Sequence, residues 1–400
     1  MSERKLRVAL ISIHYPPLRT SAAVQMSDLA QEFVRQGHET LVITPFEEFT
    51  SCWSIEVLDG VQVLHLAGLK ISLTNHLRRT IFELSLPFLM ILGLRKSPHR
   101  NTKWDLVVWY SPTIFFGPLI FYIKCKSACK AYLILRDIFP EWACDLGIIR
   151  KGFTYYFFKI VANLQYAIAD TIGVQTLSNL AYFVEWENGG SKRLEVLQNW
   201  QSPTKNIGCS IQVMNTALVG RKIFVYIGNM GIAQGMDIIL DLAFQLMHRV
   251  DIGFLFVGRG SEVDRLKIKA AELLMLNTLF FDEIKSDEMP GLLAQCHIGL
   301  LALDPRHKSH NIPGKFLTYL SAGLPVLARV NPNTDLVSLI EGEKVGLVYV
   351  GESLDVFKEM AKEIIDNSVQ YQQMASRGPI LAKEKFSTYN SVNQIIQTVK

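Results

Sequence analysis

HNIPGKFLTYLSAGLPVLA, residues His310 to Ala328, contains one complete helical pattern and the beginning of the strand that follows it. Pro313 has no amide hydrogen to lose and fits the first position of a helix, while Gly323 fits the position just after its end. Apolar runs lie on either side, at Ile298–Leu303 and Val326–Ala328. Runs of this kind, apolar on both faces, are typical of buried strands in a parallel sheet. The stretch therefore predicts a strand–helix–strand unit.

The same alternation of short apolar runs and helical patterns occurs twice along the 400 residues. Strands are expected in the first half at Arg7–Ile13, Thr40–Ile43, Val61–Leu66, Leu106–Tyr110 and Ala131–Leu135. In the second half they are expected at Ile223–Ile227, Gly253–Val257, Thr278–Phe281, Ile298–Leu303 and Val326–Ala328. The polar segment Gln198–Asn215 is interpreted as a linker. We predict an α/β protein with two doubly wound domains, residues 1–200 and 201–380, and a last helix within 381–400 that returns to the first domain.

The composition argues against several classes of protein. With 41 basic and 37 acidic residues the net charge is +4, too small an excess for a nucleic-acid-binding surface, so no nucleic acid partner is expected. The six cysteines are scattered without metal-ligand spacing, and we interpret them as reduced thiols. The first apolar run is too short for a signal peptide and is expected to be a strand.

The most apolar segment, Ile81–Leu94, is 14 residues long and contains Glu83 and Pro87. A membrane-spanning helix needs about 20 residues. Basic residues flank the segment, namely Arg78, Arg79, Arg95, Lys96 and Arg100. Together with the aromatic run FTYYFFK at Phe153–Lys159, this layout favours a segment that lies in the headgroup layer of an anionic membrane. An ordinary core helix with charged ends is the alternative.

Loops that follow parallel strands are the expected ligand sites, because helix N-termini and open amides there attract anions. Gly314 leaves backbone amides accessible at the start of the quoted helix, and Lys315 adds a positive charge. Since a lysine in a first helical turn opposes the helix dipole unless an anion is bound, we expect a diphosphate there. A well-capped helix without a ligand is the alternative.

Polar residues also follow two strands of the first domain. His14 comes just after the first strand, where a structural histidine is the alternative to a role at a ligand. Arg136, Asp137 and Glu141 follow the strand that ends at Leu135, and charges in this position are suited to contacts with a sugar or an acceptor. Salt bridges at the surface are the alternative.

In this order the motifs resemble those of retaining glycosyltransferase family 4, in particular bacterial O-antigen and capsule enzymes similar to N-acetyl-L-fucosamine transferases. The resemblance runs nearly end to end, through HYPPLRTSAAVQMSDLAQEFVRQGHETLVIT, RDIFPEWACDLGII, a strand at QTLSN, LQNW, YIGNMGIAQGMD, FLFVGRGSE, FFDEIKSDEMPGLLAQCHIGLLAL and IPGKFLTYLSAGLPVLA. It implies a GT-B fold, in which two Rossmann-like domains face each other across a cleft. The second domain then binds a nucleotide sugar and the first binds the acceptor.

The resemblance also assigns roles to individual residues. The residues expected near the reacting groups are Lys315, His14, Arg136 and Asp137. Those expected to bind the donor are Gly228, Asn229, Gln234, Arg259, Ile284, His310, Ile312, Pro313, Gly314, Lys315, Phe316 and Thr318. Those expected near the acceptor are Ser21, Ala22 and Glu141. The implied partners are a UDP-sugar, a polyprenyl-diphosphate-linked glycan and an anionic membrane surface, with no metal cofactor and a location at the cytoplasmic face of the plasma membrane.

The chain departs from the family's pattern mainly on the donor side. The family often has two glutamates eight residues apart, and the matching residues here are His310 and Thr318. An arginine and a lysine that hold phosphates are replaced by Asn229 and Gln234. The residues expected to compensate are Lys315, Arg306 and Lys308. A glycine pair after the first strand is replaced by Ser21-Ala22 or Ala22-Ala23.

The expected reaction is transfer of a sugar with its anomeric configuration retained. The departing phosphate oxygen takes the proton of the acceptor on the same face, so no protein nucleophile is needed. A UDP-sugar 2-epimerase on the same fold is one alternative, and a non-catalytic subunit that binds the nucleotide is another. A dehydrogenase is disfavoured because no GxGxxG motif follows the first strand.

Overall fold

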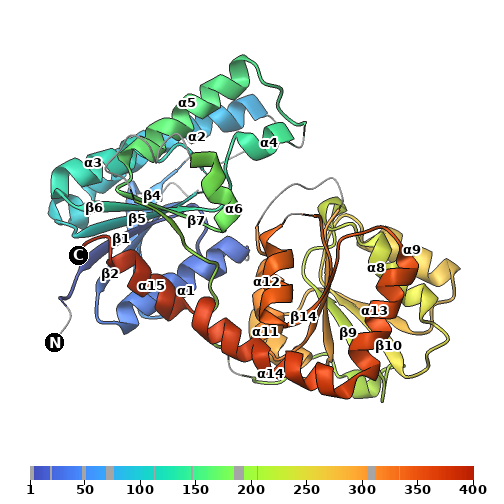
Figure 1. Cartoon of the computed structure of the whole chain (residues 1–400). Coiled ribbons are helices and arrows are strands. Elements are labelled where there is room, and N and C mark those ends of the chain that lie inside the picture. The colour runs from blue at the N-terminus through green and yellow to red at the C-terminus, as the bar shows by residue number, and fades with distance from the viewer. Residues whose placement is uncertain are drawn as a thin grey trace. The chain divides into compact units, whose positions relative to one another are not determined.

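The computed structural model describes residues 4–18, 20–46, 51–68, 76–111, 113–145, 147–183, 193–204, 206–304, 311–332 and 334–400, with only the backbone of residues 76–79. The chain divides into two compact units (Figure 1). Unit 1 is Met1–Trp200 with Thr388–Lys400, and unit 2 is Gln201–Ser387. The last helix of the chain therefore belongs to unit 1.

The described residues of unit 1 form an eight-stranded sheet in the order β3-β4-β2-β1-β5-β6-β7-β8. Neighbouring strands run parallel except β3 and β4, which are antiparallel. The strands are β1 Arg7–Ile11, β2 Glu39–Phe46, β3 Trp53–Leu58, β4 Val61–Ala67, β5 Leu106–Ser111, β6 Lys130–Leu135, β7 Thr171–Val174 and β8 Arg193–Val196. The helices are α1 Ser21–Arg35, α2 His76–Lys96, α3 Gly117–Ser127, α4 Glu141–Asp145, α5 Phe153–Ile168, α6 Leu177–Leu180 and α15 Thr388–Ile396, with short 3₁₀ turns at Pro98–Asn101 and Ala181–Phe183.

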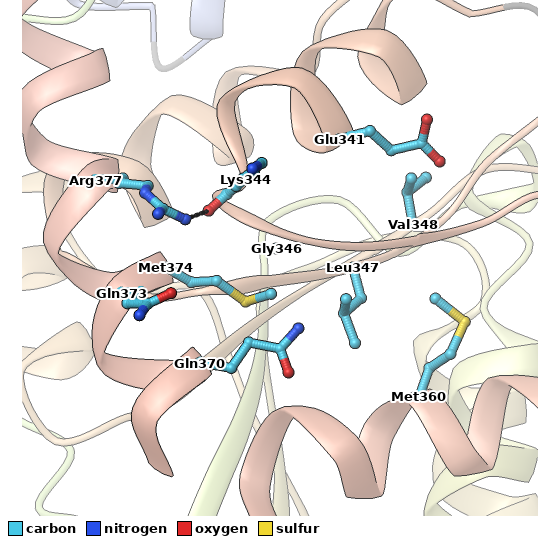
Figure 2. A pocket seen from close by; sticks show the side chains of 10 residues that line it. All are labelled: Glu341, Lys344, Gly346, Leu347, Val348, Met360, Gln370, Gln373, Met374 and Arg377. Carbon is cyan, nitrogen blue, oxygen red and sulfur yellow. Dashed lines mark hydrogen bonds between the residues drawn. The ribbon is translucent and has the colours of Figure 1, made fainter. Parts of the chain in front are cut away.

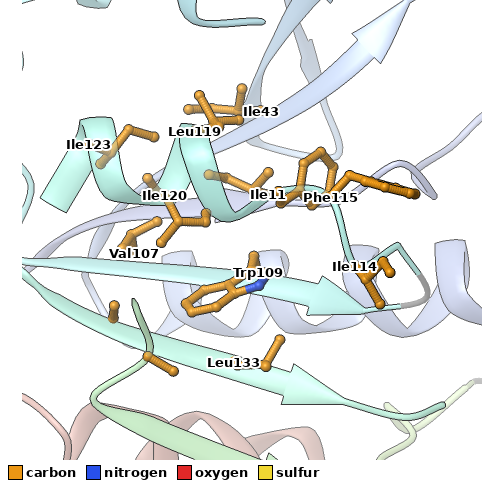
Figure 3. Close-up of a cluster of buried hydrophobic side chains, with 14 of the residues drawn as sticks. Ile11, Ile43, Val107, Trp109, Ile114, Phe115, Leu119, Ile120, Ile123 and Leu133 are labelled. Atoms are coloured by element: carbon orange, nitrogen blue, oxygen red, sulfur yellow. The ribbon is translucent and has the colours of Figure 1, made fainter. Parts of the chain in front are cut away.

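Two hydrophobic clusters fill the two faces of this sheet. On one face Ile11 and Trp109 pack with Leu119 of α3 and with residues of α2 and α5 (Figure 3). On the other face the opposite side chains of the same strands pack with Met26 of α1 and Val392 of α15. Helix α15 therefore completes the core of unit 1, although almost 200 residues of sequence separate it from the rest of that unit.

The described residues of unit 2 form a six-stranded parallel sheet in the order β11-β10-β9-β12-β13-β14. The strands are β9 Lys222–Ile227, β10 Ile252–Val257, β11 Thr278–Phe281, β12 Ile298–Ala302, β13 Val326–Arg329 and β14 Gly346–Tyr349. The helices are α8 Asp237–Gln245, α9 Val263–Glu272, α10 Met289–Leu293, α11 Gly314–Ser321, α12 Asp335–Glu343, α13 Leu354–Asp366 and α14 Ser368–Lys385, with 3₁₀ turns at Val213–Asn215, Ile232–Gln234 and Ser286–Glu288. Both units are thus doubly wound and Rossmann-like, as predicted.

Helix α11 is fixed where the strand order of unit 2 reverses, between β9 and β12. The two strands pair only near their amino ends, and the Tyr319 hydroxyl lies between them further on. It accepts a hydrogen bond from the Ile227 amide at 3.1 Å and donates one to the Leu300 carbonyl at 3.2 Å. A Cβ on Gly299 would lie 2.3 Å from the Tyr319 ring, so a glycine is required there. The carboxyl edge at such a reversal is the usual ligand site of an open α/β sheet.

Several sequence predictions need correction. Strands β3, β7, β8 and β14 were not predicted, because they are short or, like β3, largely exposed at an edge. The predicted strand at QTLSN is instead a turn into α6, with Thr176 as its N-cap. The expected linker is only partly a linker, since Ile211 and Val213 are buried in the core of unit 2.

The apolar segment Ile81–Leu94 lies within α2, and the structure divides it between core and surface. Leu86 and Met90, predicted to face a membrane, pack against the sheet instead. Phe88 and Leu92 are exposed. Within the described part of the chain, no helix combines the length and apolarity needed to cross a membrane.

Candidate functional site

The first turn of α11 presents open backbone amides at the reversal point of the sheet. Pro313 is the N-cap, with an extended conformation (φ −63°, ψ 138°). The helix therefore begins at Gly314, one residue later than predicted. Gly314 is exposed, and a side chain placed there would meet no atom within 4 Å. The amides of Gly314 and Lys315 have no hydrogen-bond acceptor among the described residues. Partial positive charge is therefore available to an anion at this point.

Phe316 does not share this accessibility. Its amide donates to the Pro313 carbonyl at 3.0 Å, and its ring is buried in the core of unit 2 against Phe386. Ile312 is buried in the same core, and Ile284 packs against it. These three side chains therefore contribute to the core of unit 2, and the prediction that the residues lie near a donor stays a prediction.

Lys315 provides a formal positive charge beside these amides. Its ammonium nitrogen lies 3.6 Å from the centroid of the Tyr226 ring. Its Cε would contact a Cβ on Gly228 at 4.0 Å, so the side chain extends across the end of β9. Burial lowers the pKa of the lysine to about 7. An anion bound nearby would restore the charged form.

Two glycine turns lie next to each other beside Lys315. The Gly228 amide donates to the Val257 carbonyl at 2.8 Å, and the Met230 amide donates to the Arg259 carbonyl at 2.7 Å. This pairing needs glycine at Gly258, where a Cβ would lie 1.9 Å from the Gly228 carbonyl oxygen. The turns after β9 and β10 are therefore a single paired structure.

Asn229 and Gln234, both predicted to bind the donor, hydrogen-bond to each other. The Asn229 side-chain amide donates to the Gln234 side-chain oxygen at 2.9 Å, and the Gly231 backbone amide donates to the same oxygen at 3.0 Å. Arg259 is exposed and forms a 3.4 Å ion pair with Glu283. The two amide side chains thus hold the turn closed, and Arg259 lies at its outer edge.

Thr318 and His310 are the two positions at which the resemblance would lead one to expect glutamates, and the structure describes only the first of them. The Thr318 hydroxyl lies 3.3 Å from both the Gln201 side-chain oxygen and the Gly314 carbonyl, either of which can accept its one proton. The Thr318 hydroxyl therefore has acceptors within the protein. His310, Arg306 and Lys308 lie outside the described residues, so the predictions made for them remain predictions.

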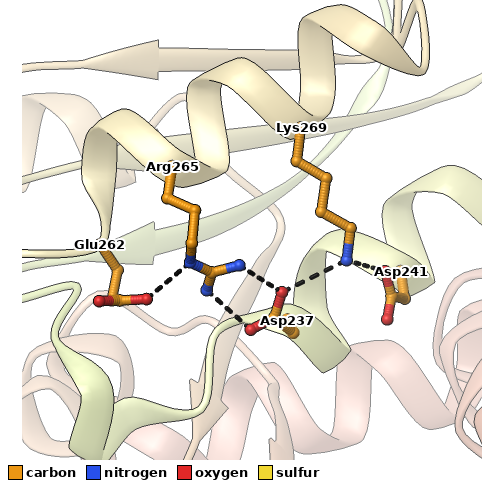
Figure 4. A network of polar contacts seen from close by, with 5 residues as sticks. All are labelled: Asp237, Asp241, Glu262, Arg265 and Lys269. Atoms are coloured by element: carbon orange, nitrogen blue, oxygen red, sulfur yellow. Dashed lines mark hydrogen bonds and ion pairs between the residues drawn. The ribbon is translucent and has the colours of Figure 1, made fainter.

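A network of charges joins α8 to α9 just beyond the paired turns (Figure 4). Arg265 donates two hydrogen bonds to Asp237, at 2.8 and 2.7 Å, and one to Glu262 at 2.7 Å. Lys269 links Asp237 to Asp241. The Arg265 hydrogen bonds lower the pKa of Asp237. No local pattern predicts this network, because Asp237 and Asp241 lie on α8 while Glu262, Arg265 and Lys269 lie at the start of α9 and along it.

The predicted residues of unit 1 lie in the loops after β1 and β6. His14 has its Nδ1 atom 3.4 Å from the Thr20 hydroxyl, and burial lowers its pKa. Ser21 is exposed and Ala22 half-buried at the start of α1. Because β1 is where the strand order of unit 1 reverses, these residues occupy the corresponding ligand position there.

Arg136 is buried, and the expectation that it contacts a sugar stays a prediction. Its guanidinium donates to the carbonyl of Leu197 at 2.6 Å and of Gln198 at 3.2 Å, and it lies 4.9 Å from the Trp200 ring centroid. It therefore holds the segment that leaves β8. Glu141 forms an ion pair with Lys159 of α5, as the salt-bridge alternative predicted. Asp137 directly follows Arg136 and has contacts of its own.

A separate cavity of about 440 Å³ lies beside the edge strand β14 (Figure 2). It is lined by Glu341, Lys344, Gly346, Leu347, Val348, Met360, Gln370, Gln373, Met374 and Arg377. It is near the amino end of β14, whereas α11 begins beyond the carboxyl ends of the strands. It is therefore not part of the site around Lys315, and sequence reasoning did not find it.

Comparison with known proteins relates unit 2 to a family. Residues 221–367 match the family model described as glycosyl transferases group 1. Over 222 residues the chain is 25% identical to the probable glycosyltransferase WbjE of Pseudomonas aeruginosa, covering 54% of this chain and 55% of that protein. Over 355 residues it is 22% identical to the putative colanic acid biosynthesis glycosyl transferase WcaI of Escherichia coli (strain K12), covering 84% and 86%. The chain thus spans about half of one relative and most of the other.

Solved structures share the fold over the whole chain. Sucrose-phosphate synthase from Thermosynechococcus elongatus matches with a TM-score of 0.72 at 14% identity, over 98% of both chains. HepE from Anabaena, in complex with UDP and glucose, matches with a TM-score of 0.68 at 14% identity, over 98% of this chain and 99% of that one. The fold is therefore the GT-B fold of these glycosyltransferases.

Proposed function

We propose, from the premise that residues 221–367 form a group 1 glycosyltransferase domain, that this chain is a retaining glycosyltransferase. Its donor is a UDP-sugar, with an N-acetylated amino sugar or a deoxy sugar as the transferred group. Its acceptor is a polyprenyl-diphosphate-linked glycan in the synthesis of a bacterial surface polysaccharide. The name of the relative WcaI, which refers to colanic acid biosynthesis, supports the choice of pathway class.

The observation that carries the proposal is the first turn of α11. Two open amides and the Lys315 ammonium lie together beside the paired glycine turns, at the reversal point of the sheet. A diphosphate is the group of a nucleotide sugar that needs such an environment. The presence of UDP in the HepE structure, which shares the fold, supports a uridine nucleotide.

In the proposed reaction, the bond between the anomeric carbon and the phosphate oxygen breaks. The acceptor oxygen bonds to the same carbon on the same face, and its proton passes to the departing phosphate oxygen. Lys315 and the amides of α11 stabilise the negative charge that develops on the diphosphate. Since these groups supply the positive charge, we propose that no metal ion takes part. The protein's other contribution is to align the two substrates.

Unit 1 is proposed to contact the membrane that holds the acceptor through α5. Phe153, Tyr156, Ile160 and Leu164 are 89%, 59%, 62% and 60% exposed, and their spacing puts them on one face of the helix. Arg150 and Lys151 precede this face and are exposed. Figure 1 shows α2, α3 and α5 on the same side of the sheet. An apolar helical face with basic residues at its end suits an anionic lipid surface.

Lys315→Met tests the catalytic part of the proposal. Turnover is measured with a panel of UDP-sugars and a lipid-linked acceptor, by release of UDP. We expect kcat/KM to fall more than threefold, which corresponds to a loss of more than about 0.6 kcal/mol of transition-state stabilisation. Lys362→Met is the control, because Lys362 pairs with Glu359 on the surface of α13. A Lys315 variant as active as this control would remove the lysine from the mechanism.

Flotation with anionic vesicles tests the membrane contact. A double variant, Phe153→Glu with Ile160→Glu, should stay at the bottom of the gradient in low salt while the unaltered chain floats. Val250→Glu is the control, because Val250 is 79% exposed in unit 2. Equal flotation of all three proteins would contradict a role for α5.

A non-catalytic nucleotide-binding subunit is the second candidate. Asn229, Gln234 and Thr318 favour it, because each is engaged within the protein where the family commonly has a charged side chain. Normal UDP binding with no turnover of any donor and acceptor pair would support this candidate. Conversion of a UDP-sugar to its epimer without acceptor would instead identify a 2-epimerase.

A further inference from the structure

Lys315 and Tyr226 come from opposite faces of the sheet in unit 2. Tyr226 is the second-last residue of β9, and its buried ring belongs to the core that α8 and α9 cover. Lys315 starts α11, which packs on the other face. The lysine side chain therefore crosses the carboxyl end of β9 to place its ammonium 3.6 Å from the Tyr226 ring centroid. This distance is well within the range of about 6 Å over which a ring face attracts a cation.

The ring is the partner that the structure gives to this ammonium. Among the described residues, no carboxylate forms an ion pair with Lys315. A carboxylate partner would have to be displaced, or would repel, when a diphosphate arrived. An aromatic face attracts the ammonium from one side and leaves its N–H groups free on the other. The arrangement therefore positions the charged form of the lysine without placing a negative charge beside it.

Tyr226 also contacts the turn that lies beside the lysine. Its hydroxyl donates a hydrogen bond to the Asn229 carbonyl at 2.8 Å. Burial raises its pKa, so the hydroxyl keeps its proton and remains a donor. One side chain thus fixes both the ammonium of α11 and the backbone that starts at Gly228. The distance between these two groups is set by a single rigid ring.

We propose that Tyr226 is a positioning residue that holds the Lys315 ammonium against the Gly228–Gly235 turn, so that both meet the same diphosphate of the donor. The inference rests on the proposed function, since it concerns the same donor. It adds a residue that neither the motifs nor the family pattern marked. Tyr226 acts through Lys315 and does not itself touch the substrate.

A double-mutant cycle separates this role from a merely structural one. UDP-glucose binding is measured by calorimetry for the unaltered chain, Tyr226→Leu, Lys315→Met and the double variant. UDP-glucose is used because its diphosphate does not titrate near neutral pH. We expect Tyr226→Leu to weaken binding about tenfold, within the range of a partly desolvated cation–π contact. In the Lys315→Met background the same substitution should weaken it less than threefold.

Tyr226→Phe is the matched control, because it keeps the ring and removes only the hydroxyl. It should bind UDP-glucose within about threefold of the unaltered chain, since the cation–π contact survives. Thermal unfolding checks that each variant is folded, and Tyr226→Met replaces the leucine variant if that one is not. Equal losses in both backgrounds, or a phenylalanine variant as weak as leucine, would overturn the proposal. No binding of UDP-glucose, of UDP or of any other UDP-sugar by the unaltered chain would refute the donor proposal itself.

Discussion

The close packing of the two glycine turns of unit 2 predicts that Gly258→Ala is strongly destabilising. Gly258 has φ 155°, a conformation that residues with a side chain rarely adopt, and its missing Cβ would lie 1.9 Å from the Gly228 carbonyl oxygen. Side-chain carbons essentially never come closer than 3.0 Å to such an atom. The turns must therefore move apart by about 1 Å, or the chain around position 258 must change its course.

The cost follows from the contacts that this movement breaks. The hydrogen bonds from Gly228 to Val257 and from Met230 to Arg259 are 2.8 and 2.7 Å long, and both would exceed hydrogen-bond length. Each contributes about 0.5–1.5 kcal/mol net, and the strained conformation adds about 1–3 kcal/mol. Unit 2 should lose about 2–6 kcal/mol in total. For a unit of this size, that lowers its melting temperature by roughly 4–24 °C.

Differential scanning calorimetry of the whole chain measures this effect on the transition of unit 2. Gly342→Ala is the matched control, because Gly342 lies in α12 with no atom within 4 Å of an added Cβ and no positive φ. Alanine there should stabilise the helix by about 0.5–1 kcal/mol. If unit 2 of Gly258→Ala melted within 1 °C of that of the unaltered chain, the paired turns would not be rigid. They could then not position a ligand.

Three further predictions concern single side chains. Thr20→Ala should lower the stability of unit 1 by about 1 kcal/mol in chemical denaturation, because the Thr20 hydroxyl accepts from the Ala23 amide as an N-cap. Arg136→Met should lower the stability of unit 1 by more than the Thr20 substitution, since the buried Leu197 carbonyl and the half-buried Gln198 carbonyl lose their donor; a smaller loss would contradict this role of the guanidinium. Between pH 7 and pH 9, the free energy of unfolding of the unliganded chain should rise more than that of the Lys315→Met variant. The pKa of Lys315 is lowered from 10.5 to about 7 by burial, so the unfolded chain binds more protons across that window; equal pH profiles would contradict this.

The fold was predictable from the sequence where strands are buried on both faces. Ile223–Ile227 and Gly253–Val257 are continuous runs of buried residues, and they form strands close to the predicted limits. Strands β3 and β8 were not predicted, because these exposed edge strands lack a continuous apolar run. The return of α15 to unit 1 could be expected from the surplus helix, but its packing against Met26 depends on tertiary contacts that no local pattern encodes.

The site was predictable only where backbone chemistry determines it. A proline and a glycine at the start of a helix, followed by a lysine, indicate open amides and a charge whatever surrounds them, and α11 has both. Side-chain roles were harder to predict. Phe316 and Arg136 follow strand ends or motif positions as ligand contacts should, yet both side chains are buried. Their orientation depends on partners, Phe386 and the Leu197 carbonyl, that are distant in sequence.

Asn229 and Gln234 stand where the resemblance would lead one to expect cationic side chains, and their neutrality is consistent with the way Lys315 is held. Tyr226 contacts both Lys315 and the Asn229 backbone, so a cation at position 229 would begin close to the ammonium. Burial already lowers the pKa of Lys315 to about 7, and a second positive charge would lower it further. The lysine would then be largely neutral before the donor arrived. Neutral amides that bond to each other close the turn without this repulsion, and they leave one ammonium to meet the diphosphate.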